Sequence, residues 1–310
     1  MGTKWVLKAT VQKAVSLMPR SQRLNRRLQQ LGGRLALGEA TVRQRLGWAG
    51  HHLRTFSELG GAERLTPGFR VLELGSGWHP LVPLAMVTAG AGEVLMCDLE
   101  DLSDEELLAE SIDHVIASAD SGELAEHLPV VLADRVDMLR DARSSLASTG
   151  RDATLGELGL VLCPGDVRRL APDAPPDLFV SNTVLEHIDP PVLVGILEAF
   201  SAMSVPGSVM SHLIDTCDHY LYVDDSISAY NFLRFSERQW RLIDNGLQPM
   251  NRLRIPQFRE LYEAAGVPVT REQRLTGEPG DLRGVPLAPP FDTMDPADVA
   301  CLAAWFDTVF

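Results

Sequence analysis

The middle of the chain alternates between short apolar runs and longer segments of helical composition. Five runs, each of five or six residues, are almost wholly apolar: 70–74, 93–97, 158–163, 177–181 and 209–214. Such runs, without polar alternation, predict strands of a parallel sheet that is buried on both faces. Because helical segments separate them, we predict a doubly wound, Rossmann-like α/β fold with a mostly parallel sheet.

Helical patterns flank this sheet. In residues 4–59 apolar positions recur near helical spacing, first at Val6, Leu7, Val11, Val15 and Leu17 before Pro19, then at Leu24, Leu28 and Leu31 before Gly32-Gly33. We predict an N-terminal helical cap over residues 1–65 that covers the ligand cleft, ending at the Thr66-Pro67-Gly68 break.

The core domain is predicted to span residues 66–270. Its second and third apolar runs are too far apart for one crossover helix, so a helical insertion is expected at about 100–156. An aromatic segment occupies about 216–254. The remaining residues, 271–310, form a Pro-rich C-terminal extension that is expected to end in a helix over 296–309.

Composition narrows the function classes. The chain has 28 basic and 42 acidic residues, a net charge of −14. Residues 1–45 carry ten basic residues and one acid, so the remainder is strongly acidic and ill suited to nucleic-acid phosphates. The basic arm could contact an anionic ligand, a membrane surface or the acidic body itself. With four scattered cysteines, no apolar stretch long enough to span a membrane and no signal-peptide pattern, a cytoplasmic protein is expected.

Two features after the first two apolar runs suggest a nucleotide-like ligand. The sequence ELGSGWHP (residues 73–80) places two glycines directly after the first predicted strand, where the backbone can turn sharply toward a ligand. Asp98 follows the second strand, about 20 residues later, where a carboxylate can accept hydrogen bonds from a ribose diol. A phosphate-binding P-loop is excluded because GxxxxGK[ST] is absent. At this point NAD and S-adenosylmethionine both remain open.

Four segments taken together resemble the class I S-adenosylmethionine-dependent methyltransferases. VLELGSGWHP (71–80) is similar to their first motif, MCDLE (96–100) to the second, PGDVRRL (164–170) to the third and DLFVSNTVLEHI (177–188) to the fourth. The likeness covers about residues 66–270. His79-Pro80 replaces the third glycine of the first loop, and the family's final antiparallel strand pair can be placed no further than Val267–Thr270.

This resemblance implies S-adenosylmethionine as cofactor and assigns its contacts. The methionine and ribose part would lie against Glu73, Gly75, Ser76 and Gly77, the ribose hydroxyls on Asp98 beside Leu99, the adenine on Asp166 and Val167, and the sulfonium near Asn182 and Thr183. Because the cofactor carries an activated methyl group, the protein mainly has to position the acceptor, and a base is needed only if the acceptor loses a proton.

The fifth strand offers that base. His212, with Asp215 as its orienting partner, is our candidate at the carboxyl end of the strand. His212, Asp215, His219 and Asp224 offer oxygen and imidazole ligands for a metal, but their spacing matches no tight pattern, so no metal is predicted. The aromatic segment that follows supplies a candidate wall for an acceptor, with Tyr220, Tyr222, Tyr230, Asn231 and Arg234.

Three functions follow from the sequence. The first is methyl transfer to an oxygen or nitrogen, with carbon as a further option, of a small molecule of bacterial specialised metabolism. The second is a transferase or cyclase that uses another part of S-adenosylmethionine and releases methylthioadenosine, and the third is a non-catalytic, cofactor-binding regulator. No nucleic-acid partner is expected, and the oligomeric state, a homodimer included, is left open.

Overall fold

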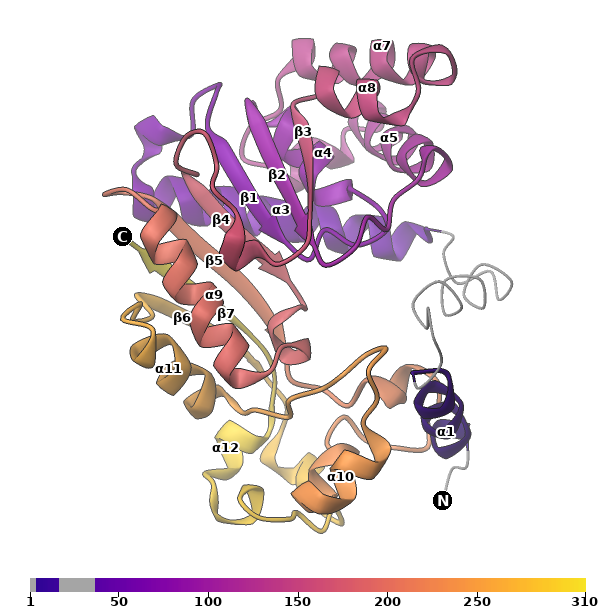
Figure 1. Cartoon of the computed structure of the whole chain (residues 1–310), viewed down its shortest axis with the longest axis vertical. Coiled ribbons are helices and arrows are strands. Elements are labelled where there is room, and N and C mark those ends of the chain that lie inside the picture. Colours follow the sequence, from indigo (N-terminus) through magenta and orange to yellow (C-terminus); the bar gives the residue numbers. More distant parts are fainter. Residues whose placement is uncertain (1–3, 17–36) are drawn as a thin grey trace. The chain divides into compact units, whose positions relative to one another are not determined.

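The computed structural model describes residues 4–16 and 37–310, and within them a seven-stranded sheet has the order β3-β2-β1-β4-β5-β7-β6 (Figure 1). The strands are β1 Arg70–Leu74, β2 Glu93–Asp98, β3 Leu160–Pro164, β4 Leu178–Asn182, β5 Val209–Asp215, β6 Arg271–Thr276 and β7 Cys301–Val309. β1 pairs in parallel with β2 and β4, and β2 pairs in parallel with β3. The predicted α/β architecture is confirmed, and each apolar run forms a strand.

The described chain divides into two compact units. Unit 2 contains residues 37–182, 195–212 and 306–310, and unit 1 contains residues 4–16, 183–194 and 213–305. The helices of unit 2 are α3 Glu39–Gly60, α4 Leu81–Thr88, α5 Glu105–Asp120, α6 Glu123–His127, α7 Ala133–Thr149 and α8 Arg151–Glu157. Those of unit 1 are α1 Lys4–Ser16, α10 Glu237–Ile243, α11 Ile255–Ala264 and α12 Pro296–Val299, while α9, Pro190–Met203, contributes to both units.

The core of unit 2 joins the sheet to the helices before and after it. All eight residues of α4 are buried, and the four helices α5 to α8 occupy the predicted insertion between β2 and β3. Leu46, Leu53 and Phe56 of α3 are completely buried in the same core. Since each such side chain contributes about 1.5–3 kcal/mol, α3 packs firmly into the core of unit 2, whereas α1 belongs to unit 1.

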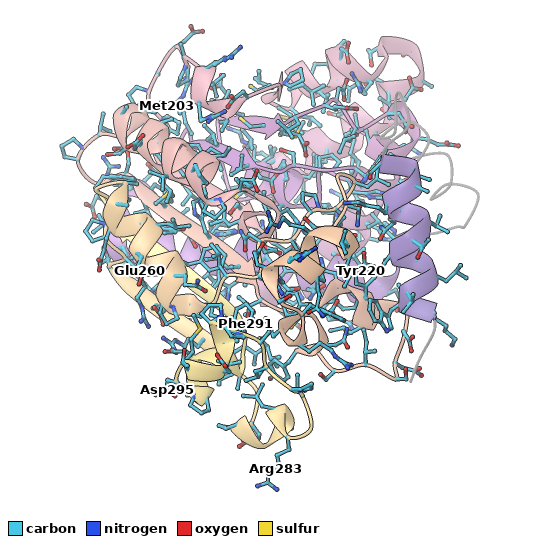
Figure 2. All side chains as sticks on the ribbon, turned by 60° about the horizontal axis from the view of Figure 1, so that its bottom comes forward. Met203, Tyr220, Glu260, Arg283, Phe291 and Asp295 are labelled. Carbon is cyan, nitrogen blue, oxygen red and sulfur yellow. The ribbon has the colours of Figure 1, made fainter. Side chains whose placement is uncertain are left out.

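Helix α1 packs within unit 1. Lys13 Nζ donates to the carbonyls of Asp244 and Arg241 at the end of α10, at 2.6 and 3.2 Å, and Lys8 Nζ lies 5.7 Å from the centre of the Tyr220 ring. Trp5 contacts the same ring, which lies beside α1 (Figure 2). The described part of the basic arm thus interacts with the protein itself. The pattern predicted from Leu17 to Gly33 lies outside the described residues.

The last two strands correct the sequence prediction. Helix α12 ends at Val299, and Cys301–Val309 is strand β7 instead of the predicted helix. Gly207 donates to Phe310 at one end of β5 and Thr216 to Leu302 at the other, so β7 runs antiparallel to β5. β6 begins at Arg271, beyond the predicted Val267–Thr270, and has no fully buried residue. A polar edge strand of this kind leaves no hydrophobic signal.

Among residues 4–16 and 37–310, no helix combines the length and apolar character that crossing a bilayer requires.

Candidate functional site

The glycine turn after β1 has the backbone that its sequence requires. Gly75 and Gly77 have φ angles of 78° and 65°, in the left-handed region that glycine adopts at little cost. The N–H groups of Gly75 and Ser76 donate to the Cys97 carbonyl at 2.7 and 3.3 Å, which ties the turn to the end of β2. The Gly165 N–H, just after β3, donates to the Asp98 carbonyl at 2.7 Å. The carboxyl ends of β1, β2 and β3 thus meet at one place.

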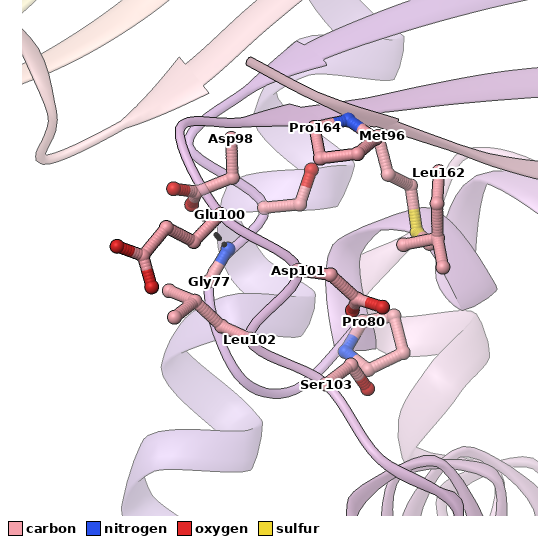
Figure 3. Close-up of a pocket in the computed structure, with 11 residues that line it drawn as sticks. Gly77, Pro80, Met96, Asp98, Glu100, Asp101, Leu102, Ser103, Leu162 and Pro164 are labelled. Carbon is pink, nitrogen blue, oxygen red and sulfur yellow. Dashed lines mark hydrogen bonds between the residues drawn. The ribbon is translucent and has the colours of Figure 1, made fainter. Parts of the chain in front are cut away.

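Asp98 lies at this meeting point. Its two carboxylate oxygens accept hydrogen bonds from the N–H groups of Gly77, at 3.1 Å, and Leu99, at 2.7 Å (Figure 3). Burial raises the pKa of the Asp98 carboxyl, and these N–H donors oppose the rise. The Leu99 side chain is 78% exposed, so it is the backbone of Leu99 that takes part in the site.

A small hollow opens beside this carboxylate. Its volume is about 20 Å³, room for about one water molecule. It is lined by Ser76, Gly77, Pro80, Met96, Asp98, Glu100, Asp101, Leu102, Ser103, Leu162 and Pro164 (Figure 3). The hollow is smaller than a nucleoside.

Glu73, in β1, carries an unusual carboxyl group. The residue is 5% exposed, and burial raises its pKa to about 8, with the Ser76 hydroxyl and then Arg45 opposing the rise. Its Oε2 atom has no hydrogen-bond partner among the described residues. A buried carboxyl that is only partly compensated in this way is suited to receive a cationic group of a ligand.

Asp166 and Val167 follow β3 as the sequence places them. Val167 is buried at 6% exposure, but Asp166 is engaged by Arg168, whose Nε and Nη2 donate to it at 2.9 and 2.6 Å. The hydrogen bonds from Arg168 lower the pKa of Asp166 to about 2. A contact from Asp166 to an adenine amino group would have to share the carboxylate with Arg168.

The end of β4 brings in a residue that the sequence analysis missed. His52 of α3 is completely buried, with Nε2 3.1 Å from Asn182 Oδ1 and Nδ1 2.9 Å from Ser211 Oγ. Burial lowers the pKa of His52 to about 3, so the ring is neutral. Asn182 Nδ2 is buried without a partner in the described part of the chain. A lone histidine within an amphipathic helix gives no sequence signal for this contact.

Thr183 follows Asn182 with a φ angle of 53°, in the left-handed region that a β-branched residue rarely adopts. Its N–H donates to the Leu213 carbonyl at 2.9 Å, which holds the chain in place where it leaves the sheet. A strained backbone at the carboxyl end of a strand is typical of functional sites.

The structure does not support His212 as the base. His212 is completely buried in β5, its ring packs against Phe200, and burial lowers its pKa to about 3. An imidazole enclosed in this way cannot reach an acceptor. Asp215 instead lies with Oδ2 3.3 Å from His219 Nε2 and 3.3 Å from the Tyr222 hydroxyl. Burial of Asp215 is outweighed by His219, and the pKa of Asp215 is lowered.

The predicted acceptor residues divide into two groups. Tyr220 and Tyr230 are buried in the core of unit 1, where the Tyr230 hydroxyl donates to the Ala300 carbonyl at 3.0 Å. Asn231 and Arg234 line a pocket of about 390 Å³ together with Trp5, Val6, Ser226, Ile227, Ser228, Gly284, Val285 and Pro286. Tyr222 is 68% exposed and contacts Asp215. The aromatic segment therefore contributes mainly to the core of unit 1, and only part of it lines a pocket.

Glu186, His187 and His219 form a further cluster in unit 1. One ligand atom from each lies within 4.8 Å of the others, a group that could hold a metal ion. Two of the three, Glu186 and His187, had no predicted role, and His219 had been considered only with other partners. The sequence analysis predicted no metal site, but it did not consider these three residues together.

Among known proteins, similarity to this chain was found only with solved structures. No family model matches the chain, and no curated protein matches it. A magnesium protoporphyrin IX methyltransferase from Synechocystis PCC 6803, with bound SAH, is 10% identical with a TM-score of 0.43, over 88% of each chain. An S-adenosylmethionine-dependent methyltransferase from Clostridium acetobutylicum ATCC 824 is 10% identical with a TM-score of 0.43, over 84% of this chain and 90% of that one. The mitomycin 7-O-methyltransferase is 14% identical with a TM-score of 0.40, over 83% of this chain and 53% of its own. Similarities at this level carry no argument about function for this chain.

Proposed function

We propose that the chain is an S-adenosylmethionine-dependent methyltransferase that acts on an oxygen or nitrogen, with carbon as a further option, of a small molecule. The observation that carries the proposal is the geometry at the ends of β1 and β2. The Gly77 N–H donates to the Asp98 carboxylate and so joins the left-handed glycine turn after β1 to the last residue of β2. In open α/β sheets, ligands bind beyond the carboxyl ends of the parallel strands, which is where this pair lies.

The buried polar groups of unit 2 fit this cofactor. Glu73 Oε2 and Asn182 Nδ2 are buried without partners among the described residues, and both lie at strand ends that the first and fourth motifs assign to the cofactor. Glu73 would hold the methionine ammonium, Asp98 the ribose hydroxyls, and Val167 the adenine face. When bound, the cofactor supplies an electrophilic methyl group. The chain has to bind the acceptor, exclude water and accept any proton that the acceptor loses.

Acceptor binding is best supported at the pocket beside Asn231 and Arg234. Its volume of about 390 Å³ falls within the usual range for small-molecule sites. Trp5, Ile227 and Val285 give it an apolar wall, and Arg234 gives it a cation. These features favour an amphipathic acceptor that carries an anionic or strongly polar group. Asn231 is less free to bind it, because Asn231 Nδ2 already donates to Asp218 at 2.9 Å.

The two alternatives from the sequence use the same cofactor site. A transferase or cyclase would release methylthioadenosine, and a regulator would release no product. A cytoplasmic location, a specialised-metabolism acceptor and a homodimer stay predictions.

Product analysis tests the proposal. The protein would be incubated with S-adenosylmethionine carrying a labelled methyl group and with a library of small metabolites, and products followed by mass spectrometry. We expect S-adenosylhomocysteine and a labelled acceptor. Asp98→Ala should weaken cofactor binding at least about tenfold, since it removes a charged hydrogen-bond acceptor. The exposed acid Asp137, replaced by Asn, is the matched control. Methylthioadenosine as the product, or unchanged cofactor affinity in a folded Asp98→Ala protein, would contradict the proposal.

A further inference from the structure

Three potential metal ligands meet beyond the carboxyl ends of β4 and β5 in unit 1. Glu186 and His187 belong to the short 3-10 helix η3, Leu185–His187. His219 is the first residue of the next 3-10 helix along the chain, η4, His219–Tyr222. The Thr183–Leu213 hydrogen bond joins the two exits from the sheet. One ligand atom of each residue lies within 4.8 Å of the other two.

Glu186 lacks a compensating partner. The residue is 2% exposed, and neither of its carboxylate oxygens has a hydrogen-bond partner among the described residues. Burial, together with the nearby Asp215 carboxylate, raises its pKa well above the ordinary value, and the backbone N–H groups of Glu186 and Asp215 oppose this rise only in part. A carboxyl group buried without a side-chain partner is costly, and a bound cation would reduce that cost.

The two histidines are held in orientations that suit metal binding. His187 Nδ1 lies 2.6 Å from the Pro249 carbonyl oxygen, so it carries the proton and leaves the Nε2 lone pair available. This backbone contact is the arrangement that metal-binding histidines usually have behind the ligating nitrogen. The His187 and His219 rings meet edge to face, with centroids 4.9 Å apart.

His219 is held from both sides. Its Nδ1 lies 3.1 Å from Gln248 Nε2, which donates to it, and its Nε2 lies 3.3 Å from Asp215 Oδ2. The ring proton is therefore on Nε2, and His219 would ligate an ion through Nε2 after the Gln248 amide turns its oxygen toward a protonated Nδ1. Asp215 then adds a second carboxylate close to the cluster.

We propose that Glu186, His187 and His219 bind one divalent transition-metal ion, with Asp215 as the adjacent carboxylate. Two imidazoles and a carboxylate suit Zn²⁺, Co²⁺ or Fe²⁺ better than Mg²⁺ or Ca²⁺, which prefer oxygen ligands. Three protein ligands leave coordination positions open for water or for a ligand oxygen.

An open coordination position would let the ion bind a hydroxyl group of the acceptor. A hydroxyl group bound to such an ion has a lowered pKa and releases its proton to water at neutral pH. An acceptor with a metal-binding hydroxyl would thus need no side-chain base, which His212 cannot provide. This use rests on the proposed function, whereas binding of the ion does not.

Cobalt titration tests the site directly. The chain would be treated with a chelator, dialysed and titrated with CoCl₂ while the visible absorption of bound Co²⁺ is recorded, with ZnCl₂ added in competition. We expect about one Co²⁺ per chain, displaced by Zn²⁺. Glu186→Gln and His219→Ala should each weaken binding by about tenfold or more, while His114→Ala, on α5 and outside the cluster, should match the wild type. Glu186→Gln keeps the shape of the side chain, so a folding defect is not expected to obscure its result.

The outcomes separate the two proposals. Absence of a Co²⁺ spectrum, or wild-type affinity in both Glu186→Gln and His219→Ala, would overturn the metal site. Calorimetric titration with S-adenosylmethionine, run on the same proteins without metal, should give equal affinities for wild type and His219→Ala. Co²⁺ binding without S-adenosylmethionine binding would retain the metal site and reject the proposed function.

Discussion

Replacing Glu73 by Gln tests the cofactor site through protein stability. Glu73 is buried at the end of β1, and its pKa is raised from 4.5 to about 8, mainly by burial. Gln keeps the size of the side chain and removes the ionisable group. Between about pH 4.5 and 8, the Glu73 carboxyl is therefore ionised in the unfolded chain but protonated in most of the folded wild type.

The size of the effect follows from linkage. A carboxyl whose pKa is raised in the folded state contributes its full stability below the unfolded pKa and loses it as pH rises through the folded pKa. The rise from 4.5 to about 8 corresponds to at most about 5 kcal/mol, at about 1.4 kcal/mol for each pH unit. The free energy of unfolding of the wild type should fall, relative to that of Glu73→Gln, between about pH 4.5 and 8.

Urea unfolding at pH 5, 6, 7 and 8, followed by circular dichroism, measures this difference. The exposed Glu126, replaced by Gln, is the control and should follow the wild type at each pH. A free-energy difference between wild type and Glu73→Gln that does not change with pH would refute the reasoning about Glu73.

Cofactor binding should lower the pKa of Glu73, whereas burial raises it. An ammonium group placed beside Glu73 favours the carboxylate, so binding of S-adenosylmethionine at pH 6.5 should release up to about one proton. Calorimetry in buffers of different ionisation enthalpy measures that release. Glu73→Gln should bind the cofactor more weakly and release fewer protons, whereas equal release by both proteins would show that Glu73 does not hold the ammonium.

Three further outcomes are expected. Arg234→Ala should raise the acceptor KM by about tenfold or more and leave cofactor affinity unchanged, which steady-state kinetics and calorimetry would check. His212→Gln should lower stability in urea unfolding but keep the acidic limb of the pH–rate profile, since His212 is a buried packing residue; loss of that limb would restore it as the base. Arg254, completely buried, donates to the carbonyls of Thr216, Val299 and Cys301. Arg254→Met should reduce the free energy of unfolding by at least about 3 kcal/mol, and a loss below about 1 kcal/mol would contradict this structural role.

The sheet was predictable because its strands are buried on both faces. β1, β2, β4 and β5 have buried interiors, and most of their residues are correspondingly apolar. β6 was not predictable in this way, since Glu272 and Arg274 form ion pairs at the surface and leave no apolar pattern. β7 contains Ala303 and Ala304, which favour a helix, but pairing with β5 determines its conformation.

The candidate cofactor residues could be placed because each lies in the last two residues of a strand or just after it. Partners that come from elsewhere in the sequence could not. His52 reaches Asn182 from α3, and Arg168 engages Asp166 from the following turn. Neither contact has a motif of its own, and both depend on how the helices and turns pack.

His212 and Asp215 differ in burial for a geometric reason. Side chains alternate between the two faces of a strand, so residues three positions apart point to opposite sides. His212 lies within β5, where both faces are covered, whereas Asp215 is the last residue of the strand. The chain then turns through η4 and brings His219 Nε2 to 3.3 Å from Asp215 Oδ2, whereas the sequence analysis expected Asp215 to orient His212. Glu186 and His187 likewise lie beyond the end of β4, and Asp98 ends β2. In a sheet covered on both sides, most interior positions serve packing, and side chains become available to a ligand near the carboxyl end of each strand, as proposed for Glu73, Asp98 and Asn182.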